Sequence, residues 1–75
     1  MMTKKDKEVL NFIVDYALRE GILPTFEEIG EGVNLKSKST IHTHVHKLEK
    51  EGYLEFHSAR YKVKGIHYER DVLRS

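Results

Sequence analysis

This sequence has no cysteine, no tryptophan, a single proline and no long apolar run. Without cysteine the chain has no disulfide, no thiolate nucleophile and no cysteine-based zinc site, and a reducing compartment suits it. A membrane span needs about 20 consecutive apolar residues, and acidic residues interrupt the N-terminal segment where a signal peptide would need an apolar run. The 75 residues therefore predict one small domain located in the cytoplasm.

Features of an enzyme are also missing. The sequence contains no recognisable pair of nucleophile and base and no glycine-rich phosphate loop. We therefore expect neither an enzyme nor a cofactor, and nothing in the sequence indicates a small-molecule ligand.

The formal net charge of +1 hides an uneven distribution of charge along the chain. Residues 6–31 contain seven acidic and two basic side chains, whereas residues 36–64 contain seven basic and three acidic ones. Four of the five histidines also lie in the basic half. The basic half could bind phosphates, and the acidic half would repel them.

Capping signals predict three helices before the first strand. Two capping boxes, with an acidic residue three positions after a threonine, are Thr3 with Asp6 and Thr25 with Glu28. The first helix would end at Gly21 and the second near Val33. Asn34 can adopt the left-handed conformation of a tight turn, and the gap to a third cap at Ser37 is too short for an antiparallel return. The second and third helices are therefore predicted to form a helix-turn-helix.

The third predicted helix, 37–52, has two chemically different sides. Ile41, Val45 and Leu48 recur at helical spacing and form a stripe that must be buried. The opposite side carries hydroxyl, imidazole and ammonium groups, and no acid lies on that side between residues 36 and 47. This side is compatible with DNA, although an ordinary solvated helix shows the same polarity.

The pattern changes from helical to alternating after residue 52. It predicts strands at 53–56 and 65–68, joined by a loop at 57–64. The loop carries alternating basic residues, which are typical of a wing beside a DNA-binding helix, although charges at a loop tip also keep an edge strand from aggregating. The expected fold is mostly α with a small β-hairpin: a winged helix-turn-helix with a three-helix bundle and a two-stranded antiparallel wing. We assign residues 1–68 to this domain and 69–75 to a C-terminal tail.

Several segments carry a resemblance to a known family: LPTFEEI at 23–29, SKSTIHTHVHKLE at 37–49, GYL at 52–54 and GIH at 65–67. In this order they resemble the winged-helix DNA-binding domain of the LexA repressor family. The resemblance implies a transcriptional repressor that docks its third helix in the major groove and its wing on the DNA backbone. The second half of that family, a self-cleaving serine peptidase domain that also dimerises, has no counterpart after Tyr68. Self-cleavage is therefore not expected of these residues.

Positions on the third helix and the wing predict two kinds of contact with double-stranded DNA. Residues near the start and on the outer side of the helix are expected to reach base edges: Ser39, Thr40, His42, Thr43 and His46. Residues expected to hold phosphates are Thr25, Ser37, Lys38, Lys47, Arg60, Lys62 and Lys64. His44 lies nearer the apolar stripe and is expected to pack inside.

Two other functions fit parts of the pattern. The chain could be a winged-helix protein-interaction module whose basic wing meets an acidic partner, and competition with DNA would separate this function from DNA binding. His42 and His46, four positions apart, could hold Zn²⁺ or Ni²⁺ in a metal-responsive regulator. A metal site needs three or four ligands, so we predict none.

Val14 and Leu18 form an apolar pair that the helical period places on the outward side of the first helix. We predict that this pair either forms part of a homodimer contact or is covered by Val72 and Leu73 of the tail. Scattered apolar residues also occur on the surface of monomers.

Overall fold

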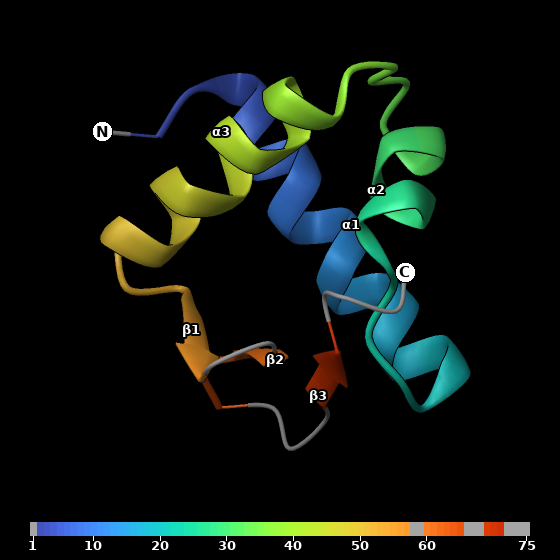
Figure 1. Ribbon diagram of the computed structural model, residues 1–75. Helices are drawn as coiled ribbons and strands as arrows, with labels where there is room; N and C mark the ends of the chain where they lie inside the picture. The colour runs from blue at the N-terminus through green and yellow to red at the C-terminus, as the bar shows by residue number, and fades with distance from the viewer. Residues whose placement is uncertain (1, 58–59, 66–68, 72–75) are drawn as a thin grey trace.

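A computed structural model describes residues 2–57, 60–65 and 69–71, with only the backbone path given for 69–71. Its elements are α1 (Lys4–Glu20), α2 (Phe26–Gly32), α3 (Lys38–Lys50), β1 (Leu54–His57), β2 (Arg60–Val63) and β3 (Glu69–Asp71). The three helices pack together, α3 lies across the N-terminal half of α1, and the sheet lies at the end where α3 leads into β1 (Figure 1). This arrangement confirms the predicted winged helix-turn-helix.

Both predicted capping boxes are present. At the start of α1, the hydroxyl of Thr3 accepts from the backbone N–H of Asp6 at 3.1 Å, and the Thr3 N–H donates to the Asp6 carboxylate at 2.7 Å. Thr25 and Glu28 repeat the same two bonds at 3.1 and 2.7 Å at the start of α2. Gly21 ends α1 with a φ of +75°, in the left-handed region that glycine adopts without steric cost.

The turn between α2 and α3 has the predicted left-handed residue, because Asn34 has a φ of +59°. Leu35 N–H donates to the carbonyl of Gly30 at 2.7 Å and closes the turn. A Cβ atom at Gly30 would lie 2.6 Å from Cδ1 of Ile41, so α2 and α3 approach each other closely here. The predicted helix-turn-helix is therefore confirmed, and glycine at position 30 permits its tight packing.

The hydrophobic core draws on all three helices and on β1 and β2. Ile41, Val45 and Leu48 of α3 are buried, as the apolar stripe predicts. Burial of such side chains is the main favourable term in folding. Among the described side chains, the buried apolar cluster consists of Val9, Ile13, Ala17, Leu23, Phe26, Ile29, Val33, Ile41, Val45, Leu48, Leu54, Tyr61 and Val63.

The sheet differs from the prediction. Within the described residues it contains three antiparallel strands in the order β1-β2-β3, with His57 opposite Arg60 and Leu54 opposite Val63 in the first pair. The predicted strand at 65–68 is wrong at Gly65, which lies in a turn, and residues 66–68 lie outside the described part of the chain. The second strand is Arg60–Val63, inside the predicted loop. In addition, β3 falls in the predicted tail 69–75 and pairs with β2.

Buried side chains of β2 explain this outcome. Tyr61 and Val63 alternate with Arg60 and Lys62, so one side of the strand faces the core and the other side carries the charges. The Tyr61 hydroxyl donates to the backbone carbonyl of Pro24. The wing, which we define as β1 and β2, is therefore fixed to the loop that precedes α2.

Candidate nucleic-acid interface

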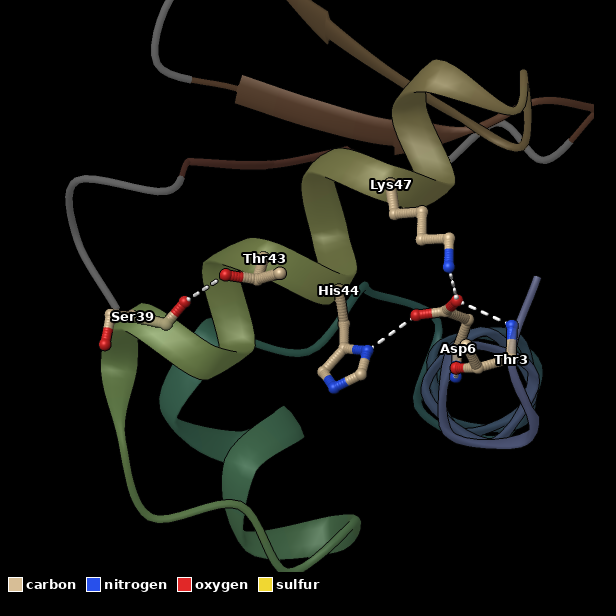
Figure 2. A network of polar contacts seen from close by, with 6 residues as sticks. All are labelled: Thr3, Asp6, Ser39, Thr43, His44 and Lys47. Atoms are coloured by element: carbon tan, nitrogen blue, oxygen red, sulfur yellow. Dashed lines mark hydrogen bonds and ion pairs between the residues drawn. The ribbon is translucent and has the colours of Figure 1, made fainter. Parts of the chain in front are cut away.

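Five residues predicted to reach base edges, namely Ser39, Thr40, His42, Thr43 and His46, are all exposed on α3. The Thr43 hydroxyl donates to the backbone carbonyl of Ser39 at 2.9 Å, which leaves its oxygen available to accept a hydrogen bond from outside (Figure 2). The helix begins after Ser37 as predicted, but the Ser37 side chain makes no capping bond and instead pairs with the Ser39 hydroxyl at 2.8 Å.

Aromatic contacts hold the two exposed histidines of α3, His42 and His46, in place. The ring of His42 meets Phe26 of α2 edge-on, with 4.9 Å between centroids. His46 stacks on Phe56 of β1, with 6.0 Å between centroids and an interplanar angle of 22°. Phe56 in turn stacks on Tyr61 of β2 at 5.9 Å. These ring contacts connect α2 to α3 and α3 to both strands of the wing.

Three of the predicted cationic side chains are exposed. Lys38 lies in the first turn of α3, Arg60 at the start of β2 and Lys64 in the turn that follows β2. Lys62 is half-buried, and its ammonium lies 3.8 Å from a carboxylate oxygen of Glu55 on β1. An ion pair of this exposure and length contributes little to stability and leaves the ammonium accessible.

Two of the predicted phosphate contacts have other roles in the structure. Thr25 is buried, with 7% of its surface exposed, and its hydroxyl caps α2. Lys47 points toward α1, where its ammonium lies 3.0 Å from Oδ2 of Asp6 (Figure 2). The structure therefore does not bring Thr25 and Lys47 together with the other cationic and hydroxyl side chains.

Asp6 is a polar centre that the sequence analysis missed. Its carboxylate is 1% exposed, and its Oδ1 lies 2.6 Å from Nδ1 of His44. Burial by itself would raise the pKa of Asp6, but hydrogen bonds from His44, the Thr3 backbone and Lys47 outweigh it and hold the pKa well below its ordinary range. His44 packs inward as predicted, and Asp6 is the partner that keeps it there.

The predicted outward pair on α1 does not form. Val14 is partly buried and packs against the core, so its placement on the outward side was wrong. Leu18 is 71% exposed. Val72 and Leu73, which were predicted to cover the pair, lie outside the described residues.

The described part of the chain contains no group of three or more His, Cys, Asp or Glu side chains that could hold a metal ion. His42 and His46, considered above as metal ligands, lie 6.1 Å apart between ring centroids. In the same described residues, no helix is long and apolar enough to cross a bilayer.

The exposed side of α3 carries hydroxyl and imidazole side chains, and α3 packs against β1 of the wing. The family model described as LexA DNA binding domain matches residues 1–62. This chain belongs to the LexA DNA-binding domain family. The match covers all three helices and most of the wing that Figure 1 shows.

Curated LexA repressors share the same region. The chain is 43% identical to the LexA repressor of Shouchella clausii over 53 residues, which is 71% of this chain and 26% of that protein. It is 47% identical to the LexA repressor of Lactiplantibacillus plantarum over 51 residues, covering 68% of this chain and 24% of that protein. The chain therefore spans about a quarter of the length of the LexA relatives that it matches.

Proposed function

We propose that this chain binds double-stranded DNA sequence-specifically and serves as the DNA-binding part of a transcriptional repressor in the cytoplasm. The observation that carries the proposal is the exposed side of α3, which offers hydroxyl and imidazole groups and keeps its one acidic residue, Glu49, in the last turn. A helix with this chemistry can enter the major groove, because its first two turns present hydrogen-bonding groups to base edges with no carboxylate among them, and the carboxylate of Glu49 comes only in the last turn, 3.5 Å from His46. Membership of a family of DNA-binding domains supports the same function.

The proposed contacts fall into two sets. Side chains of α3, which we call the recognition helix, read bases: Ser39, Thr40, His42, Thr43 and His46. Side chains that flank them hold phosphates: Ser37, Lys38, Arg60, Lys62 and Lys64. Thr25 and Lys47 leave the second set because the hydroxyl of Thr25 and the ammonium of Lys47 are bound within the protein.

One copy of this domain would cover one half-site. We propose that two copies occupy a two-fold symmetric site, and Leu18 is the exposed apolar residue of α1 that we assign to their contact. Sedimentation of the chain and of its Leu18→Glu variant on DNA tests this assignment. The wild-type chain should form a dimeric complex that the variant does not form, and identical behaviour of the two would exclude Leu18 from the contact.

Selection of bound duplexes from a random pool tests the proposed function. The wild-type chain should enrich a defined sequence, and Thr43→Ala should change which base is preferred at one position. Arg60→Ala, on the wing, should lower affinity for every duplex and flatten the slope of log affinity against log salt by about 0.9. Two results would contradict sequence reading by α3. One is that the wild-type chain enriches no sequence from the pool, and the other is that Thr43→Ala and Arg60→Ala both lower affinity equally for every duplex.

A further inference from the structure

A single carboxylate connects the start of α1 to two side chains of the recognition helix. Oδ1 of Asp6 lies 2.6 Å from Nδ1 of His44, and Oδ2 lies 3.0 Å from Nζ of Lys47 and 2.7 Å from the backbone nitrogen of Thr3. Figure 2 shows His44 and Lys47 extending from the same side of α3 toward Asp6. The partners are distant in sequence, since 38 positions separate Asp6 from His44.

These bonds restrain α3 in a way that its apolar contacts do not. Burial of Val45 and Leu48 is favourable in many slightly shifted arrangements, because the hydrophobic effect has no preferred direction. Hydrogen bonds to two oxygens of one carboxylate require defined distances and angles. Since His44 and Lys47 are three positions apart, they lie on neighbouring turns of one helix face and resist rotation and sliding together.

We propose that Asp6 is a positioning residue for DNA recognition, which sets the rotation of α3 about its axis by holding His44 and Lys47. The inference rests on the proposed DNA-binding function. Each held residue directly follows a residue assigned to a base contact, because Thr43 precedes His44 and His46 precedes Lys47. The bonds on the inner side of the helix therefore fix the side chains on its outer side.

The required tolerance is small. Side-chain tips lie about 5–6 Å from the axis of an α-helix, so a rotation of about 10° moves each tip by about 1 Å. A recognition side chain has to be held within about 0.5 Å of its productive position. Loss of the bond from Asp6 to His44 or to Lys47 would thus lower affinity for the preferred DNA sequence more than affinity for DNA of random sequence.

The same bonds have a consequence for charge. Lys47 is 36% exposed and its ammonium faces the Asp6 carboxylate, so the pair has no net charge to offer to DNA. Release of Lys47 from Asp6 would leave one additional unpaired cation on the recognition helix. In salt titrations each additional phosphate contact steepens the slope of log affinity against log salt by about 0.9.

The test compares Asp6→Asn and Lys47→Met with Glu28→Gln, a matched control from the second capping box, whose carboxylate bonds to Thr25 and Tyr16. Each variant is titrated with the duplex selected by the wild-type chain and with a random-sequence duplex of equal length. Titrations are run over a range of salt, at a temperature where circular dichroism shows every variant folded. Lys47→Met is expected to fold even if Asp6→Asn does not, because Lys47 is partly exposed.

Asp6→Asn should bind the selected duplex about tenfold more weakly, a loss like that from one mismatched base pair, and should bind the random duplex with a slope steeper by about 0.9. Lys47→Met should lose the same selectivity with an unchanged slope, and Glu28→Gln should match the wild type on both duplexes. Equal losses on both duplexes for Asp6→Asn, or a flatter slope for Lys47→Met, would overturn the positioning role. Failure of the wild-type chain to prefer any duplex would instead refute the proposed function.

Discussion

The two capping boxes of this protein have the same local geometry and different surroundings. In both, a threonine hydroxyl accepts at 3.1 Å and a threonine N–H donates at 2.7 Å. The carboxylate of Asp6 also holds two side chains of α3, whereas the carboxylate of Glu28 accepts from the hydroxyl of Tyr16 on α1 at 2.8 Å. A capping motif therefore predicts where a helix begins, but it does not predict which distant element its carboxylate will bind.

The largest expected effect is the difference in stability between a variant that lacks the Asp6 carboxylate and one that lacks the Glu28 carboxylate. Asp6→Ala should lower the free energy of unfolding by about 3 kcal/mol, because it removes the acceptor shared by a partly buried His44 bond, the Lys47 ion pair and the helix cap. Glu28→Ala should lower it by about 1 kcal/mol. Urea unfolding followed by circular dichroism measures both. Similar losses would mean that the bonds from Asp6 to α3 add nothing to stability.

A smaller effect is expected in how the contribution of Asp6 to the free energy of unfolding changes with pH. The folded protein holds the pKa of Asp6 below its ordinary value of 3.8, so the unfolded chain binds the proton first as the pH falls and the stabilisation is lost. The gap in unfolding free energy between the wild type and Asp6→Asn, about 2 kcal/mol at pH 7, should therefore narrow below about pH 5.

Urea unfolding at a series of pH values measures this gap. Leu18→Ala, at an exposed position without a titrating group, is the control and should keep a constant offset from the wild type. A gap for Asp6→Asn that stays constant down to pH 2 would exclude the ionised carboxylate as the source of the stability.

The smallest effect is expected at the two threonines. Comparing Ser with Ala at position 3, and then at position 25, isolates the capping hydroxyl from the threonine methyl group. Thr3→Ala should be about 1 kcal/mol less stable than Thr3→Ser, and the same difference is expected between Thr25→Ala and Thr25→Ser. Thermal unfolding measures the four variants. Clearly unequal differences would show that the two caps are not equivalent, which would remove the basis of the comparison.

Local signals allowed much of this fold to be predicted. The capping threonines, Gly21 and Asn34 act through the conformation of a few neighbouring residues, and each was found where the sequence placed it. The apolar stripe of Ile41, Val45 and Leu48 likewise needs only the helical period. These features are encoded within single elements, so a single sequence contains enough information to find them.

Features that depend on distant partners were missed. The segment from Arg60 to Val63 carries charges on alternate positions, and these led to a loop assignment although Tyr61 and Val63 belong to the core. Lys47 was predicted to hold a phosphate, and its ammonium lies 3.0 Å from the Asp6 carboxylate. No spacing rule links residues about 40 positions apart in the sequence, and such pairs appear only when the helices pack.

The buried hydroxyl of Tyr61 has a consequence for how this domain would meet its ligand. Its carbonyl partner, Pro24, directly precedes the residue that caps α2, so one short stretch sets both the start of that helix and the place of the wing. The position of β2 relative to α2 is thereby determined in the free protein. Association would then immobilise few backbone segments, and little conformational entropy would oppose it.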